Sequence, residues 1–194
     1  IAAFLIERIR EHGLPLLPFS RGSEALLRRA RYAGFAELSD EGLLAGLEQW
    51  LAPLLGRRLG DIDPQALHQA LLGQVSHGDR QRLDKLVPPQ FTSPAGTSHA
   101  IDYDDDGGPS VEVRVQALFG LDQHPMFGQP PQPLLLKLTS PGGKPIQTTR
   151  DLPGFWTGSW ADVAKEMRGR YPRHNWPDDP AVAVASLKTK RAQE

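Results

Sequence analysis

The sequence predicts an α+β fold, in which a helical subdomain (1–88) precedes a small antiparallel sheet that packs against a C-terminal helix (89–179). Apolar residues recur at helical spacing as far as the Pro88-Pro89 pair, whereas beyond Phe91 they alternate with polar residues as strands do. The 19 Gly and 18 Pro residues predict many turns between these elements. Residues 180–194 are expected to form a tail.

The expected helices of the first subdomain begin and end at residues that favour helix termini. Gly13 and Gly34 are expected to end the first two helices, because glycine tolerates the left-handed conformation of a C-terminal cap. Ser23 is expected to cap the second helix and Ser39 the third, where acidic residues follow and favour the helix dipole. The apolar faces of these helices carry the following residues: Ile1, Leu5 and Ile9; Leu26, Leu27 and Ala30; Leu43, Leu47, Trp50, Leu51 and Leu54; Leu67 and Leu71; Leu83, Leu86 and Val87.

Proline delimits the later helices of this subdomain. Pro53 and Gly56 are expected to close the third helix. Asp63 followed by Pro64 is a cap and then a proline at the first helical position, where the missing N–H costs nothing. The last helix is expected to stop before Pro88, because proline cannot continue a helix.

Two hairpins are expected beyond residue 90. The clearest strand is the valine alternation of residues 111–115, with residues 98–103 as its expected partner across the acidic turn 104–108. Residues 134–139 and 146–149 read as the second hairpin. A short apolar turn and a proline-rich loop between the hairpins complete this part, at 117–121 and 125–133.

The C-terminal helix is expected to open at Ser159, where Ser159 and Asp162 resemble a capping box, and to end at Gly169. Its apolar residues fall three or four positions apart and should face one way: Trp156, Trp160, Val163 and Met167. Such periodicity is first a packing signal, so this stripe is expected to seat the helix on the sheet.

Composition excludes several classes of function. A net charge of −1 excludes a globally basic nucleic-acid binder, although a local basic patch remains possible. The absence of cysteine excludes disulfides, thiolate zinc sites and a cysteine nucleophile, which fits the reducing cytoplasm, the expected location. No apolar run approaches the roughly 18 residues that cross a membrane, so no membrane partner is expected. Ile1 lies inside an amphipathic helical pattern, and the chain is therefore interpreted as a fragment.

Two motifs resemble ligand sites but lack the required context. Residues 102–107 match the opening of an EF-hand loop, yet the twelfth position, which needs a bidentate carboxylate, is Val113. An acidic hairpin turn is the favoured interpretation. Gly142-Gly143-Lys144 resembles a phosphate loop, but Leu138 stands where that loop needs glycine and Pro145 where it needs Ser or Thr. A connection between two strands is favoured there.

No catalytic, cofactor-binding or metal-binding residues are assigned within this chain. The six histidines lack the spacing of a helical zinc site, and no Gly-x-Ser-x-Gly motif frames a nucleophilic serine. Catalysis by the chain itself is therefore not expected.

A basic and aromatic segment near the C-terminus is the candidate nucleic-acid site. Cationic side chains neutralise phosphates and aromatic faces stack on bases, so their interleaving suits single-stranded nucleic acid. The alternative is a solvated helix end, whose arginines favour the helix dipole, with a tryptophan packed on the core. The candidate residues are Lys165, Arg168, Arg170, Tyr171, Arg173 and Trp176.

Several stretches resemble the C-terminal region of HrpB-type, DEAH-box ATP-dependent RNA helicases. The resemblance extends over about residues 26–180 and rests on strings that are specific to that family. These are Leu38–Leu43, Trp50–Pro53, Phe91–Tyr103, Val111–Leu121, Ile146–Trp156 and, most closely, Arg168–Asp179.

The resemblance implies a parent protein that couples ATP hydrolysis to RNA unwinding, with ATP and Mg²⁺ as its cofactors. Two RecA-like motor lobes, with a Walker loop and DEAH carboxylates, would precede this segment in the same chain. Neither motif occurs here, so no motor residue is carried over. The segment is expected either to guide single-stranded RNA past the motor or, alternatively, to brace the lobes or recruit a partner protein through exposed loops such as 125–133.

Overall fold

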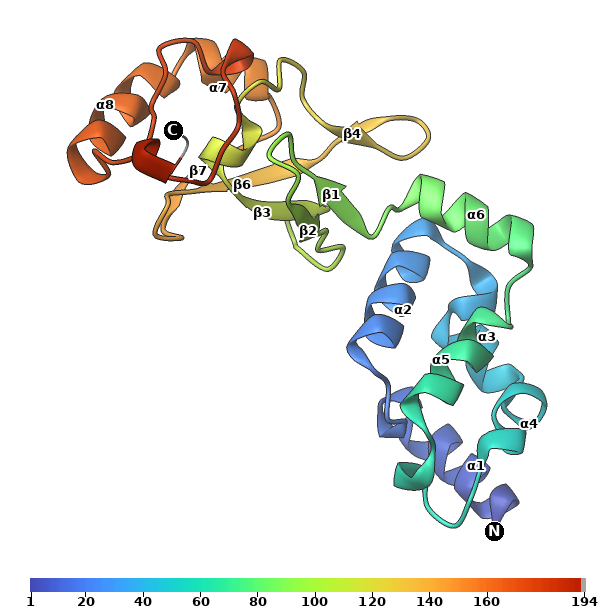
Figure 1. Cartoon of the computed structure of the whole chain (residues 1–194). Helices are drawn as coiled ribbons and strands as arrows, with labels where there is room; N and C mark the ends of the chain where they lie inside the picture. The colour runs from blue at the N-terminus through green and yellow to red at the C-terminus, as the bar shows by residue number, and fades with distance from the viewer. Residues whose placement is uncertain (193–194) are drawn as a thin grey trace. The chain divides into compact units, whose positions relative to one another are not determined.

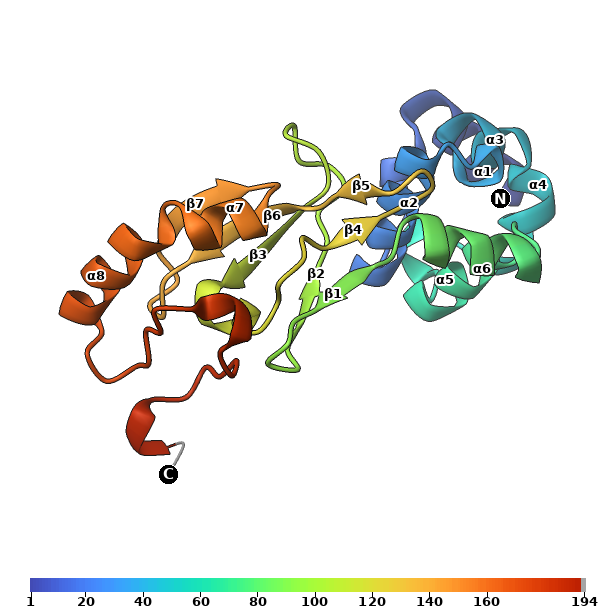
Figure 2. The same cartoon turned by 90° about the horizontal axis from the view of Figure 1, so that it is seen from above.

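The computed structural model describes residues 1–192 and divides into two compact units, Ile1–Pro89 and a second unit that starts at Gln90. The first unit is helical, and the second combines small sheets with helices (Figures 1 and 2). The expected α+β class is therefore confirmed, and each unit buries its own set of apolar side chains.

Short helices joined by loops and 3₁₀ turns form the first unit. They are α1 (Ala2–His12), α2 (Arg21–Ala33), α3 (Asp40–Ala45), α4 (Leu47–Trp50), α5 (Pro64–Leu72) and α6 (His77–Leu86). The predicted caps at Ser39 and Asp63 are confirmed, since Ser39 Oγ accepts the Gly42 N–H at 3.0 Å and Asp63 accepts two backbone N–H groups. The predicted cap at Ser23 is wrong, because Ser20 Oγ accepts the Ser23 N–H at 3.1 Å and caps α2 instead.

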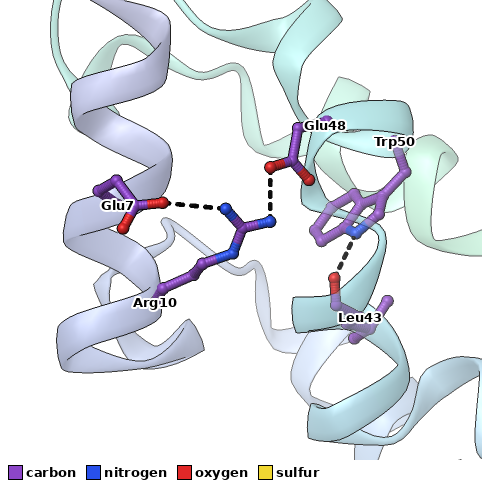
Figure 3. Close-up of polar contacts among 5 residues, drawn as sticks. All are labelled: Glu7, Arg10, Leu43, Glu48 and Trp50. Atoms are coloured by element: carbon purple, nitrogen blue, oxygen red, sulfur yellow. Dashed lines mark hydrogen bonds and ion pairs between the residues drawn. The ribbon is translucent and has the colours of Figure 1, made fainter.

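The third expected helix is interrupted rather than continuous. It breaks at Gly46, which lies between α3 and α4 with φ −106° and ψ 17°, and glycine has a low helix propensity. The predicted apolar stripe still points into the core, where Leu43, Leu47 and Leu51 are almost fully buried. Trp50 Nε1 donates to the Leu43 carbonyl at 2.8 Å, which ties the two short helices together (Figure 3).

Polar side chains also join distant helices of the first unit. Arg10 donates to Glu7 at 3.0 Å and to Glu48 at 2.5 Å, so it links α1 to α4 (Figure 3). Arg29 is buried on α2, donates from Nε to the Val87 carbonyl at 2.7 Å and pairs with Asp84. These bonds fix the end of α6 against α2.

The main sheet of the second unit is mixed, not antiparallel as predicted. Its order is β3-β6-β7, with β3 (Ser110–Arg114), β6 (Leu135–Thr139) and β7 (Pro145–Thr149). The predicted β6–β7 hairpin is confirmed, but β3 pairs with β6 in parallel. Residues 115–134 supply the long crossover that a parallel pair requires, and an alternating pattern cannot reveal the direction of pairing.

Two short hairpins complete the strands of the second unit. β1 (Gln90–Thr92) pairs with β2 (Ser98–Ala100), and β4 (Met126–Phe127) pairs with β5 (Gln132–Pro133), so the proline-rich loop is a hairpin tip. The predicted pairing of residues 98–103 with the valine strand is reduced to a single bridge, Asp102 to Ser110. The strand signal was correct there, but the partner was wrong.

Two helices and an aromatic cluster form the rest of the second unit. α7 (Leu152–Thr157) and α8 (Trp160–Arg170) lie beside the main sheet (Figures 1 and 2). The predicted capping box at Ser159 is absent, because Ser159 has a helical backbone and makes no side-chain cap bond. The helix also continues past Gly169 to Arg170. The predicted apolar stripe is confirmed as packing, since Trp156, Trp160 and Met167 are buried. The two tryptophans belong to an aromatic cluster in which neighbouring ring centroids lie no more than 6.5 Å apart: Phe119, Phe155, Trp156, Trp160 and Trp176.

Of the tail expected over residues 180–194, residues 193 and 194 lie outside the described residues. Residues 180–192 contain two single 3₁₀ turns and form hydrogen bonds with the rest of the second unit. The Gly120 N–H donates to the Pro180 carbonyl at 2.8 Å, and the Lys190 N–H donates to the Arg173 carbonyl at 2.7 Å. The last part of the chain that the structure describes is therefore fixed beside the candidate site.

Candidate nucleic-acid interface

The candidate cations lie on the exposed face of α8 and in the loop that follows it. Lys165, Arg168 and Arg170 are exposed on the helix, while Ala164 and Met167 lie on its buried side. At 3.6 residues per turn, Lys165 points away from the buried side, whereas Arg168 and Arg170 lie at its two opposite edges.

Arg168 belongs partly to the fold. Its guanidinium donates to the Trp176 carbonyl at 2.7 Å and to Asp178 at 2.8 Å, and its side chain is 46 % exposed. The Asp178 pair is fully solvated and contributes little to stability, but the bond to a main-chain carbonyl holds the loop in place. Arg168 is therefore a positioning residue of this surface as well as a cation.

The other cations of the segment are more available. Arg170 lies 3.5 Å from Glu166 in an exposed pair one helical turn apart, which solvent screens. Lys165 and Arg173 are exposed, and neither forms an ion pair within residues 1–192. These three side chains can exchange water or a weak partner for a phosphate at little cost.

Of the two predicted aromatic groups, Tyr171 keeps an accessible edge. It is half-buried, its hydroxyl lies 3.3 Å from Ser140 Oγ, and its carbonyl accepts the Trp176 indole N–H at 2.9 Å. A Cβ on Gly142 would lie only 2.8 Å from the tyrosine oxygen. A larger residue at Gly142 would therefore displace the Tyr171 hydroxyl. The antiparallel pairing of β6 with β7 confirms the interpretation of residues 142–144 as a strand connection.

The prediction that Trp176 offers a stacking face is wrong. The residue is 4 % exposed and its ring packs edge-on against Phe119 and beside Trp160. The ring therefore belongs to the core, and this was the alternative that the sequence left open.

Two further cations were missed by sequence reasoning. The Lys190 N–H donates a hydrogen bond to the Arg173 carbonyl. The Lys144 N–H donates to Ser140 Oγ at 3.1 Å, and this Ser140 oxygen lies 3.3 Å from the Tyr171 hydroxyl. Both lysine side chains are exposed. Their contacts are long-range, so local spacing carried no signal for them. We name the set Lys144, Lys165, Arg168, Arg170, Arg173 and Lys190, with Tyr171, the α8 basic surface.

In the acidic turn 104–108, the carboxylate of Asp105 already has hydrogen-bond and ion-pair partners. Asp105 pairs with Lys137 and accepts from the Gly107 N–H and the Ser110 hydroxyl. The Lys137 ammonium, helped by these two donors, holds the pKa of the Asp105 carboxyl well below its usual range. Among residues 1–192, no three His, Cys, Asp or Glu side chains gather where a metal ion could bind.

Helices that could span a membrane are also absent from the described residues, since none is both long and apolar enough. The finding agrees with the short, amphipathic helices described above.

Comparison with known proteins places the chain in a family. Residues 50–180 match the family described as ATP-dependent helicase C-terminal, HrpB_C. The chain is 40 % identical to the ATP-dependent RNA helicase HrpB of Escherichia coli (strain K12), over 96 % of this chain and 24 % of that protein.

Two solved structures agree with this match. The crystal structure of the E. coli DExH-box NTPase HrpB is 39 % identical with a TM-score of 0.82, over 95 % of this chain and 24 % of that one. The crystal structure of the E. coli DEAH/RHA helicase HrpB is 38 % identical with a TM-score of 0.69, over 88 % and 23 %. The chain thus spans about a quarter of the length of the relatives it matches. With a family model that covers more than half of its residues, the chain belongs to the HrpB helicase C-terminal family.

Proposed function

We propose that the α8 basic surface guides single-stranded RNA along an ATP-dependent RNA helicase of which this chain is a C-terminal, non-motor segment. ATP and Mg²⁺ would bind to motor lobes elsewhere in that protein, and no residue of this chain is assigned to them. The observation that carries the proposal is that the main chain of two distant lysines is hydrogen-bonded to the basic segment or to a residue that contacts it. Lys144 and Lys190, distant in sequence, join the four cations of residues 165–173.

The charges of this surface suit a phosphate backbone. Its ion pairs are exposed, so they offer little resistance to replacement by a phosphate. Arg and Lys contacts to phosphate release counterions, which makes binding depend on salt. Phosphate contacts do not read the bases, and the half-buried Tyr171 is the aromatic residue of this surface, so the binding should be largely independent of RNA sequence.

Fluorescence anisotropy with a labelled single-stranded RNA oligonucleotide tests the proposal. Affinity should fall with added salt at a log–log slope near 0.7 for each phosphate neutralised. The triple variant Lys165→Ala, Arg170→Ala, Arg173→Ala should weaken binding. If each side chain neutralises one phosphate, the total log–log slope should fall by about 2. These three positions avoid Arg168, whose loss would also release the Trp176 carbonyl.

A matched control variant loses the same charge from the first unit. Arg21 and Lys85 are exposed without an ion pair among residues 1–192, and Arg31 forms an exposed pair with Asp40. Replacing these three by Ala should leave RNA affinity unchanged. Equal affinity of the wild type and the α8 variant would reject the α8 basic surface as an RNA site.

A protein-docking or structural module is the second candidate function. Two observations favour it: Arg168 serves the main chain of its own loop, and Trp176 is buried. In that case the chain would brace the motor lobes or recruit a partner. Binding to separately produced motor lobes, together with indifference to RNA, would decide for this function.

A further inference from the structure

A polar cleft at the end of the main sheet is distinct from the α8 basic surface. It has a volume of about 310 Å³ and lies wholly within the second unit, beside β3 and β6 (Figures 1 and 2). These two strands pair in parallel, so their last residues, Arg114 and Thr139, lie on neighbouring strands about 4.8 Å apart. Both residues line the cleft, together with His99, Glu112 and Leu187.

Thr139 contributes a hydroxyl group that the fold itself does not use. The residue is 5 % exposed, and its side chain forms no hydrogen bond within residues 1–192. Burial of a hydroxyl without a partner opposes folding, so buried hydroxyls are normally hydrogen-bonded. A buried hydroxyl that lacks a partner and lines a cleft is therefore a group that a ligand can engage.

Two charges of opposite sign lie on the same face of β3. Glu112 and Arg114 are both exposed, with the buried Val113 between them, as strand alternation requires. Neither forms an ion pair within residues 1–192. The carboxylate repels a phosphate group, so the cleft differs from the α8 basic surface and suits a polar group that both donates and accepts hydrogen bonds.

His99 offers the face of a ring rather than a charge. Its Nε2 lies 2.8 Å from Thr97 Oγ1, which holds the ring in place. Burial lowers the pKa of His99, and a hydrogen bond with the Glu112 backbone only partly opposes this, so the ring is mainly uncharged at neutral pH. An uncharged imidazole that is fixed at its edge is suited to stacking on a base.

A guanine base matches these features together. Its N1–H and amino group are adjacent donors for a carboxylate, and its O6 and N7 are adjacent acceptors for a guanidinium. Adenine and cytosine carry an amino group but no ring N–H beside it. Uracil has no amino group, and its two carbonyl oxygens flank its single N–H, where the carboxylate repels them. Glu112 and Arg114 therefore favour guanine over the other three bases.

The cleft is connected to the α8 basic surface through two segments of the chain. Gly143, which lines the cleft, directly precedes Lys144, and Leu187 precedes Lys190 by three residues. We propose that the cleft holds one guanine of the single-stranded RNA that the α8 basic surface guides. The inference rests on the proposed function, and it adds a preference at one nucleotide to binding that is otherwise independent of sequence.

Nuclear magnetic resonance titration of the isotopically labelled chain with the four ribonucleoside monophosphates tests the cleft by itself. Guanosine monophosphate (GMP) should shift the amide signals of residues 99, 112–114, 139 and 187. It should bind at least about tenfold more tightly than uridine monophosphate (UMP), because one good bidentate contact discriminates by about that factor. Inorganic phosphate at the same concentration should leave these signals unchanged.

Two variants of the cleft and a matched control sharpen the test. The Glu112→Gln, Arg114→Gln variant keeps the net charge and should weaken GMP binding about tenfold, with loss of the preference over UMP. The control Arg21→Gln, Glu37→Gln removes the same two charges from exposed positions of the first unit and should bind GMP as the wild type does. Thr139→Val should weaken GMP binding about threefold or more at an unchanged urea midpoint, because its hydroxyl has no partner in the described fold.

RNA oligonucleotides separate this proposal from RNA guidance. An oligouridine with one central guanosine should bind the wild type more tightly than the same oligomer without it, and the Glu112→Gln, Arg114→Gln variant should lose this difference. The triple variant of the α8 basic surface should lose affinity for both oligomers and still bind GMP in the cleft.

Three results would overturn the proposal. The four monophosphates could bind alike, or none of them could shift the signals of the cleft. Inorganic phosphate could compete with GMP, which would assign the cleft to an anion. The two oligomers could bind equally well while their affinity still depends on the α8 basic surface. That last outcome would leave RNA guidance intact and remove the cleft from it, whereas an α8 triple variant with undiminished RNA affinity would reject the guidance on which the proposal rests.

Discussion

In the first unit α2, α3, α5 and α6 each begin at a side chain that caps a backbone N–H two or three residues away. In the second unit large side chains also reach backbone groups far along the chain. Ser39, Asp63 and Ser76 cap helices locally. In the second unit Trp156 donates to the Leu121 carbonyl and Trp160 to the Pro177 carbonyl, both near 2.9 Å. The helical unit is thus specified mainly by local signals, and the mixed unit by long-range bonds from large side chains.

The aromatic cluster should therefore be the most sensitive point of the molecule. Trp160 is 1 % exposed at the centre of the cluster, so Trp160→Ala should destabilise the second unit by about 3–5 kcal/mol. Urea unfolding followed by fluorescence reports mainly this unit, which holds three of the four tryptophans. Far-ultraviolet circular dichroism should show the helices of the first unit unfolding at an unchanged midpoint. A common shift of both transitions would contradict the separation of the two units.

The first unit also has a long-range bond from a buried side chain to the main chain, at Arg29. Arg29→Met removes the bond to the Val87 carbonyl and the pair with Asp84, and should cost roughly 2 kcal/mol, because a buried acceptor loses its partner. The measurement is the urea midpoint from circular dichroism. Arg31→Met, which breaks only an exposed pair, is the matched control and should cost well under about 1 kcal/mol.

Two predicted helix caps allow the two units to be compared, because the cap at Ser39 is present and the cap at Ser159 is absent. Ser39→Ala should destabilise the first unit by about 1 kcal/mol through loss of the bond to the Gly42 N–H. Ser159→Ala should leave the second unit unchanged, because Ser159 makes no cap bond. Thermal unfolding of the two variants measures both, and a cost at Ser159 equal to that at Ser39 would contradict the described start of α8.

The second unit should lose stability in acid. Burial lowers the pKa of His124, whose Nε2 lies 2.6 Å from the Leu134 carbonyl and whose Nδ1 accepts the Leu152 N–H at 3.0 Å. Burial also lowers the pKa of His99. With a folded pKa below the ordinary value of about 6.5, the unfolded chain takes up the proton first as pH falls.

Stability of the second unit should therefore decline as pH falls below about 6.5, toward the folded-state pKa of these two groups. Urea unfolding by fluorescence at a series of pH values measures this decline. His124→Gln should lower stability at neutral pH and flatten the dependence. A wild-type stability that rises over the same interval would contradict the described environment of His124.

Features that depend on neighbouring residues could be predicted from the sequence, whereas features that depend on distant segments could not. Ser39 and Asp63 act on neighbours, so their caps could be predicted, and the Trp156–Met167 spacing correctly predicted a packed face. The parallel pairing of β3 with β6 could not be predicted, because alternation fixes which face is buried and not which strand lies beside it.

The candidate site was only partly predictable for the same reason. Lys165, Arg170 and Arg173 are exposed as a short charged run suggests. The burial of Trp176 and the approach of Lys144 and Lys190 depend on contacts between distant segments, for which the local pattern holds no information. In the first unit, Ile1 was expected on the apolar face of the first helix with Leu5 and Ile9, but it is exposed while the other two are buried.

Hydrogen–deuterium exchange with and without single-stranded RNA tests the central claim most directly, since it maps the bound surface on the unaltered chain. The account predicts that RNA slows exchange at residues 140–144, 165–176 and 186–192. Exchange in residues 1–89 should be the same with and without RNA. Protection confined to the helical unit, or no protection at saturating RNA, would contradict the assignment of the α8 basic surface to RNA.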